Sequence, residues 1–212
     1  MALYLSGDPA ADTLLEGDGF ALLIGMVLDQ QVPLERAFSA PYALRERLGG
    51  ELSVGAIAAA PLDRLVAAFS EKPALHRFPA AMAERVQRLA QLIEERFGGR
   101  AEAVWENAQS GAELLANVRS LPGFGVQKAQ IFVALLGKRL AVRPPGWDVA
   151  AGQFGEAGSF RSVADIDGPD ALAEVREHKR QMKAAARSLA AATHGDEAIA
   201  ATSPGQRSRK RR

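Results

Sequence analysis

Residues 121–129, Leu-Pro-Gly-Phe-Gly-Val-Gln-Lys-Ala, have a spacing suited to holding an anion with main-chain groups. Gly123 and Gly125 permit backbone angles and close approaches that a Cβ would forbid. The amides of residues 125–127 then point outward from the start of the next helix, where the helix dipole favours negative charge. Residues 112–119 have the spacing of a preceding helix. This helix-hairpin-helix pattern predicts contact with a phosphate, and DNA is the partner that we expect. The alternative is a corner in which the glycines only make the bend.

The remaining segments predict the helices that must position this hairpin. Apolar residues recur at helical spacing and no convincing alternating segment occurs, so the fold class expected is all-α with about ten helices. Residues 20–31 are nearly all apolar and predict a buried helix that Pro33 stops. The expected helices are 10–16, 20–31, 34–49 with a break at Pro41, 53–60, 62–69, 79–97, 101–107, 112–119, 126–137, 147–154 and 169–192.

Composition and charge bound the class of protein. The chain has 212 residues, 48% of them hydrophobic, and no cysteine, which excludes disulfides, a thiolate nucleophile and a cysteine-ligated iron–sulfur cluster. No apolar run approaches the roughly 18 residues of a membrane helix, and no signal peptide is evident, so we expect a cytoplasmic protein. Residues 207–212 carry five positive charges, whereas the net charge of the whole chain is +1. We therefore expect a mildly acidic folded domain over 1–195 and a disordered basic tail over 196–212 that adds salt-sensitive affinity for phosphates.

The hairpin string resembles the helix-hairpin-helix element of the HhH-GPD superfamily of base-excision DNA glycosylases, in the branch without an iron–sulfur cluster. The resemblance extends over residues 20–155 and is strongest at 23–31 and 121–129. It implies two helical lobes with a DNA-binding cleft between them and a helix-hairpin-helix over residues 112–137. In relatives, a glutamine after the early buried helix enters the duplex beside an everted nucleotide; Gln31 is the better match and Gln30 its neighbour. The DNA-binding residues expected are Gln30, Gln31, Leu121, Gly123, Gly125, Val126, Gln127 and Lys128.

The resemblance also implies a catalytic carboxylate at the start of the helix after a loop with proline and glycine. Asp148 fits this description, and Trp147 beside it is a candidate to stack on a flipped base. A carboxylate there would stabilise an oxocarbenium-like transition state electrostatically. If the apolar residues 140–142 are matched to the strip that precedes the family aspartate, the catalytic position falls on Arg143 instead. Asp148 would then only favour a helix N-terminus.

Two further family features concern the hairpin itself. Members that also nick the strand use a lysine amine just after the hairpin as the nucleophile, and the matching position here is Gln127. Lys128 is rotated by about 100° on the helix, so we expect it to point to a phosphate and expect no Schiff-base lyase activity. Several relatives bind a potassium or sodium ion with hairpin carbonyls, here those of Arg119, Leu121 and Phe124.

The sequence therefore predicts a monomeric DNA repair protein that binds double-stranded DNA containing a damaged or modified base. The leading function is a monofunctional DNA glycosylase acting near the nucleoid. The alternative is a non-catalytic relative that recognises damaged or distorted DNA. A third class, a helical protein–protein adaptor, requires the hairpin to be a coincidence.

Overall fold

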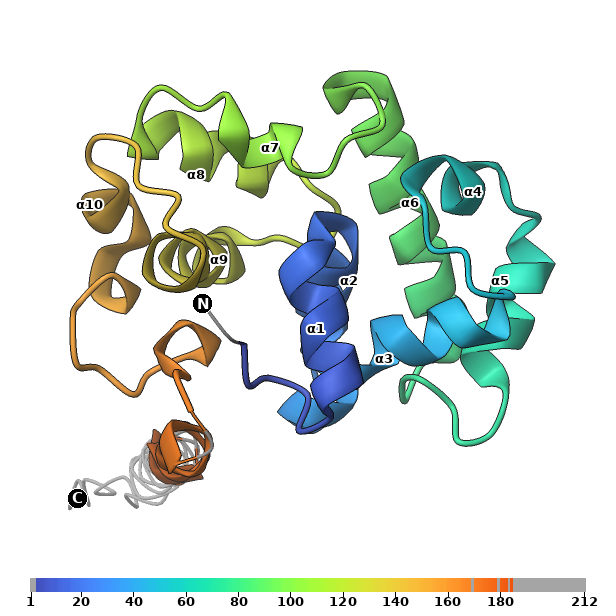
Figure 1. Cartoon of the computed structure of the whole chain (residues 1–212), viewed down its shortest axis with the longest axis horizontal. Coiled ribbons are helices and arrows are strands. Elements are labelled where there is room, and N and C mark those ends of the chain that lie inside the picture. Colours follow the sequence, from blue (N-terminus) through green and yellow to red (C-terminus); the bar gives the residue numbers. More distant parts are fainter. Residues whose placement is uncertain (1–2, 169, 179, 183, 185–212) are drawn as a thin grey trace, which may run out of the picture. The chain divides into compact units, whose positions relative to one another are not determined.

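The computed structural model describes residues 3–168, 170–178, 180–182 and 184, and over this part the chain is all-α, as predicted (Figure 1). No strand occurs among these residues. The elements are α1 (Pro9–Gly17), α2 (Gly19–Leu28), α3 (Leu34–Arg47), α4 (Val54–Ala59), α5 (Leu62–Ser70), α6 (Pro79–Phe97), α7 (Ala103–Glu106), α8 (Gly111–Arg119), α9 (Val126–Arg139), α10 (Trp147–Ala151), and the 3-10 helices η1 (Gly152–Phe154) and η2 (Val163–Asp165). Residues 170–178 are helical as well.

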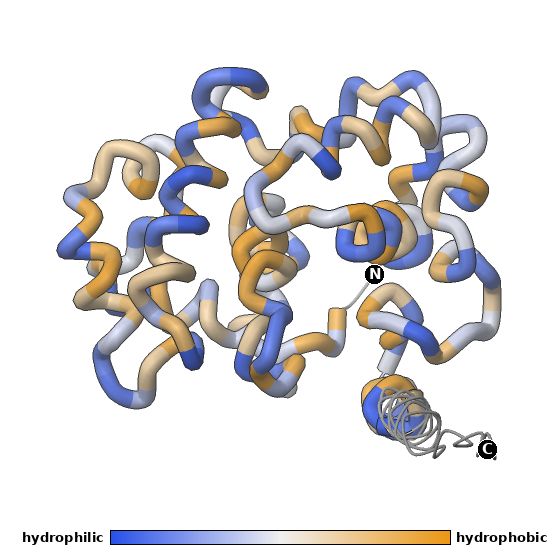
Figure 2. Tube along the Cα trace, turned by 180° about the vertical axis from the view of Figure 1, so that it is seen from behind, coloured by the Kyte–Doolittle hydropathy of each residue, from blue (hydrophilic) through white to orange (hydrophobic). Residues whose placement is uncertain are grey.

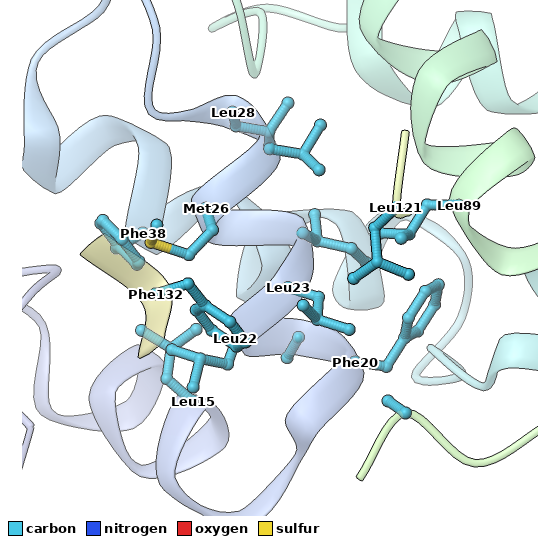
Figure 3. Close-up of a cluster of buried hydrophobic side chains, with 14 of the residues drawn as sticks. Leu15, Phe20, Leu22, Leu23, Met26, Leu28, Phe38, Leu89, Leu121 and Phe132 are labelled. Atoms are coloured by element: carbon cyan, nitrogen blue, oxygen red, sulfur yellow. The ribbon is translucent and has the colours of Figure 1, made fainter. Parts of the chain in front are cut away.

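Helix α2 is the centre of the core, because all ten of its residues are buried. Its side chains belong to one hydrophobic cluster with Phe38, Leu89 and Phe132, which come from α3, α6 and α9 (Figure 3). Gly25 lets α3 approach closely, since a Cβ at this position would lie 2.7 Å from the Phe38 ring. The Asp18 side chain caps the start of α2 by accepting hydrogen bonds from the next amides.

Several helix ends differ by one to three residues from the sequence-based expectation, and one predicted break is absent. The predicted break at Pro41 is wrong, because α3 continues through Pro41. Burial of Phe38, Pro41 and Leu44 against the core stabilises the helix by more than the missing amide hydrogen bond destabilises it. Helix α2 ends at Leu28 rather than at residue 31, so Gln30 and Gln31 lie beyond the helix in an irregular turn.

The helices form two groups on either side of α1 and α2 in the view of Figure 1. In one group α6 packs against α4 and α5, and in the other α9 packs against α8, α10 and η2. Helix α2 contacts both α3 and α6. In most of these helices hydrophobic and hydrophilic residues alternate along the trace, as expected for helices with one buried face (Figure 2).

The compact unit that contains these helices extends to Val175, and a second unit begins at Arg176. The predicted domain boundary at residue 195 and the predicted basic tail over 196–212 lie outside the described residues, as does the end of the helix expected over 169–192. In the described part of the chain, no helix combines the length and apolar character needed to span a bilayer.

Candidate nucleic-acid interface

A tight turn joins α8 to α9 where the sequence predicts the hairpin. The Phe124 amide donates to the Leu121 carbonyl at 3.1 Å, which closes a four-residue turn. Pro122 and Gly123 occupy its central positions, and Gly123 has a φ of +88°. Proline followed by a residue with positive φ is the pattern of a type II turn, in which the second position favours glycine. The local sequence thus dictates the local backbone.

The apolar residues of the turn fix it to the core. Leu121 and Phe124 are both buried, and Leu121 belongs to the same cluster as Leu23 and Leu89 (Figure 3). The Phe124 ring meets the Phe132 ring edge to face, with a centroid separation of 5.7 Å. Because these side chains are anchored inward, the main chain of residues 122–125 is held at the surface with little freedom to move.

The start of α9 presents unpaired main-chain donors to solvent. Gly125 is its N-cap and supplies no capping side chain, and the first helical hydrogen bond joins the Ala129 amide to the Gly125 carbonyl. The residues Gly125, Val126 and Gln127 are exposed. No acceptor for their three amides occurs among the residues that the structure describes. A helix N-terminus with exposed amides and no cap is an arrangement that binds anions.

Two arginines of α6 flank this turn and were not singled out by the sequence analysis. Arg85 and Arg88 line an open hollow of about 480 Å³ together with residues 121–125. The Arg85 stem lies over the turn, since a Cβ on Gly123 would be 3.0 Å from Arg85 Cδ. Within the described residues, neither guanidinium forms a salt bridge, and no acidic residue lines the hollow. The hollow therefore combines two cations with the outward amides.

A signal for this pair exists in the sequence. Arg85 and Arg88 are three residues apart on one helix, so they share a face, and Arg85 has no acidic residue three or four positions away. Sequence alone could not place that face beside the hairpin, because residues 89–120 separate the two segments and their packing depends on the tertiary fold.

Lys128 is not directed to this hollow, whereas the sequence predicts that it points to a phosphate. Its ammonium donates to the Met26 carbonyl at 2.6 Å and to the Val27 carbonyl at 3.3 Å. These carbonyls belong to the last turn of α2, where a cation is favoured by the helix dipole and by acceptors without helical partners. Lys128 therefore joins the start of α9 to the end of α2, and it positions the hairpin rather than extending it.

The side chains of the two glutamines after α2 point in different directions, one inward and one to solvent. The Gln30 amide nitrogen donates to the Val27 carbonyl at 2.8 Å and lies 3.5 Å from the Met82 sulfur, so this side chain is turned inward. Gln31 is exposed and has a φ of +57°. A residue other than glycine in this left-handed region is strained by about 1–3 kcal/mol, and such strain is concentrated at functional sites. Of the pair, Gln31 is thus the one placed to contact a ligand.

A buried histidine connects this turn to an exposed aromatic ring. His76 Nε2 lies 2.9 Å from the Gln30 carbonyl, and the Phe78 amide donates to His76 Nδ1 at 3.0 Å. Since Nδ1 accepts, the proton of the neutral ring is on Nε2, which donates to Gln30. Phe78 is 44% exposed, with the Arg77 guanidinium 5.3 Å from its centroid. Phe78 precedes Arg85 by two helical turns, about 10 Å, on the same side of α6.

We group these residues under one name, the hairpin face. It consists of Arg85, Arg88 and residues 121–125, which line the hollow, together with residues 126–127 at the start of α9, Phe78 at the start of α6 and Gln31 after α2. Its members come from the turn after α2, from α6, and from the junction of α8 and α9. It offers main-chain donors and guanidinium groups for phosphate oxygens, an amide side chain, and an aromatic ring.

Asp148 does not belong to the hairpin face. Trp147 packs directly on Gly137, near the end of α9, and the Gly111 amide donates to the Pro145 carbonyl at the start of α8. The hairpin joins the opposite ends of these two helices. Gly137 follows Val126 by eleven residues, about 16 Å along the helix. Asp148 is exposed and forms no hydrogen bond or ion pair with the described residues.

Arg143 and Trp147 lie together at that far end. Arg143 Nε donates to the Gly137 carbonyl at 2.7 Å, and its guanidinium carbon is 5.7 Å from the centroid of the Trp147 ring. Whichever of the two alignments is used, the position matched to the family aspartate is in the segment beside Gly137 near the end of α9, whereas the hairpin is at the start of α9.

The cation site stays a prediction. Of the three carbonyls expected to bind potassium or sodium, that of Leu121 already accepts the turn hydrogen bond from Phe124. No group of three or more histidine or acidic side chains placed to hold a metal occurs in the described part of the chain.

The comparisons with known proteins give no match: no family model, no curated protein and no solved structure matches this chain.

Proposed function

We propose that this protein binds duplex DNA through the hairpin face and recognises positions where the duplex is damaged or distorted. The observation that supports the proposal most strongly is the convergence of three unpaired amides at the start of α9 with Arg85 and Arg88 from a separate helix. Amides at a helix start and guanidinium groups are the usual protein partners of phosphate oxygens. Their contacts would position the protein without reading sequence.

Preference for distorted DNA is proposed from the exposed groups beside this phosphate site. Phe78 has a ring that is 44% exposed, and Gln31 has an exposed side chain with both a donor and an acceptor. An aromatic ring stacks on a base only where the neighbouring base is missing or unstacked, and such stacking contributes about 1–3 kcal/mol. A gap or an abasic position would provide that opening.

Base release is the sequence prediction that this geometry supports least. An excised nucleotide needs a carboxylate beside its sugar, and Asp148 follows Trp147, whose ring packs on Gly137, about 16 Å along α9 from Val126. A second carboxylate to test is that of Asp29, which stands at the C-cap of α2 two residues before Gln31. We therefore favour the binding function. Single-turnover base release with Asp148→Asn and Asp29→Asn variants tests the glycosylase alternative.

The proposal is tested with labelled duplexes that are identical except for a central abasic or one-nucleotide gap. Wild type should bind the interrupted duplex at least tenfold more tightly than the intact one. Phe78→Ala should remove most of this preference and leave binding to the intact duplex unchanged. Phe160→Ala is a matched control, because Phe160 is 40% exposed but is not part of the hairpin face. Absence of binding to any duplex at low salt would overturn the proposal.

A further inference from the structure

A second cavity lies at the opposite end of α9 from the hairpin face. It has a volume of about 390 Å³ and is lined by the end of α9, by Arg143 and Trp147, by residues 155 and 157–160, and by Asp165 and Asp167. Val126 and Arg139 are thirteen residues apart on one helix, about 20 Å. A ligand in this cavity would therefore not touch the hairpin.

The loop over residues 156–162 is fixed in place by one buried carboxylate. Asp165 is 2% exposed and pairs with the Lys138 ammonium at 2.6 Å. Its other contacts are the Ser159 hydroxyl at 2.9 Å and the amides of Arg161 and Ser162 at 2.9 and 3.0 Å. Removing two charges from water is expensive unless further hydrogen bonds compensate, as they do here. The loop wall of the cavity is thus preformed.

The positive charge of the cavity is not fully balanced. Lys138 is neutralised by Asp165, and Arg139 lies 3.7 Å from Asp167. Arg143 has no carboxylate partner in the described part of the chain, and no acceptor there contacts its terminal nitrogens. Because its Nε is bonded to the Gly137 carbonyl and its guanidinium lies over Trp147, these terminal nitrogens are held at the cavity without a partner.

Two partly exposed aromatic rings complete the cavity wall. Trp147 is seated on Gly137 so closely that a Cβ there would lie 2.1 Å from the ring, and this contact fixes the orientation of the indole. Phe160 is 40% exposed on the opposing loop. Aromatic walls with a small number of placed polar groups, in a volume of roughly 300–1,000 Å³, are typical of sites for small molecules.

From this combination we infer that the cavity binds a small planar aromatic anion, with the anionic group on Arg143 and the ring against Trp147 and Phe160. A nucleoside monophosphate and a free aromatic carboxylate both have this chemistry. The inference is independent of DNA binding by the hairpin face, because the two sites share no residue.

Calorimetric titration of the full chain tests the inference with four probes: adenosine monophosphate, naphthoate, adenosine and inorganic phosphate. We expect the monophosphate or naphthoate to bind at least tenfold more tightly than adenosine or phosphate. Arg143→Gln and Phe160→Ala should each weaken that binding at least tenfold, which corresponds to about 1.4 kcal/mol. Whichever of the two aromatic anions binds identifies the source of the ligand.

Two controls separate this site from the rest of the protein. Arg64→Gln removes an exposed cation on α5, and the Arg85→Gln/Arg88→Gln pair disables the proposed DNA site; both should leave the affinity for the aromatic anion unchanged. Phe160 is exposed, so its truncation tests the site without threatening the fold. The inference is overturned if neither aromatic anion binds at about 1 mM, if phosphate alone binds equally well, or if the Arg143 and Phe160 variants bind like wild type.

Discussion

Replacing Lys128 with methionine distinguishes a structural lysine from a phosphate-binding one. The substitution keeps a long unbranched side chain and removes the ammonium that donates to the Met26 and Val27 carbonyls. A hydrogen bond from a charged group contributes about 1.5–3 kcal/mol. The bond to Met26 is short, that to Val27 is long at 3.3 Å, and the side chain is half-buried. We therefore expect the free energy of unfolding to fall by about 2 kcal/mol.

For a chain of this size such a loss lowers Tm by roughly 4–8 °C. Urea unfolding followed by circular dichroism gives the free energy, and duplex affinity is then measured at a temperature where both proteins are folded. Arg64→Met is the control, since it removes an exposed cation of α5. The structural role of Lys128 is refuted if the Lys128→Met variant unfolds like wild type but binds the duplex less tightly. In that case the slope of log K against log salt should also fall by the amount of one phosphate contact, about 0.9.

Gln31→Gly should raise the free energy of unfolding by about 1 kcal/mol, because glycine tolerates the positive φ, while weakening binding to a gapped duplex several-fold. Ala141→Gly is the control, because it relieves the same φ of +57° away from the hairpin face. It should raise the free energy of unfolding by the same amount without changing the affinity for the gapped duplex. A Gln31→Gly variant that binds this duplex like wild type would contradict the assignment of Gln31 to the DNA contact. Burial raises the pKa of Asp18, and this effect is larger than that of the hydrogen bonds from the Ala21 and Phe20 amides, which lower the pKa. The folded state then holds this proton more tightly than the unfolded state, so stability falls as pH rises from the ordinary aspartate pKa through the raised one. Asp18→Asn keeps the cap and should be more stable than wild type at pH 7. Its free energy of unfolding, measured by urea titration, should vary less with pH below pH 7 than that of wild type. The same pH dependence in both proteins would exclude the effect.

The hairpin is the part of the molecule that the sequence predicts best. Pro122 followed by Gly123 specifies a turn with one positive φ, and the apolar Leu121 and Phe124 fix which side of the turn is buried. These determinants are all local, so no tertiary information is needed. The all-α class follows equally well, from helical periodicity along the whole chain.

What the sequence could not provide is the placement of residues by distant packing. Lys128 has the positive charge and the position after the hairpin that are expected of a phosphate contact. Only the packing of α2 against α9 reveals that its ammonium instead donates to the α2 carbonyls. Arg85 and Arg88 are ordinary exposed cations until α6 is placed beside the turn. Pro41 is locally a helix breaker, and burial of its neighbours overrides that preference.

The position of Asp148 likewise depends on the tertiary fold and could not be predicted from the sequence. Its loop has the order of residues expected before a catalytic carboxylate, but the path of residues 140–147 decides where the carboxylate lies. That path stays at the end of α9, where the Val142 amide donates to the Leu136 carbonyl and Trp147 rests on Gly137. Residue order alone does not report whether a loop returns along a helix or turns at its end.

The central claim is that Arg85 and Arg88 contact DNA phosphates beside the hairpin amides. It is tested most directly by the dependence of duplex affinity on salt concentration for Arg85→Gln/Arg88→Gln, compared with Arg64→Gln/Arg96→Gln. The control pair removes the same charge from exposed positions outside the hollow. Each lost phosphate contact lowers the slope of log K against log salt by about 0.9. Our account predicts a decrease of about 1.8 for the first pair and none for the second; equal slopes for the two pairs would contradict it.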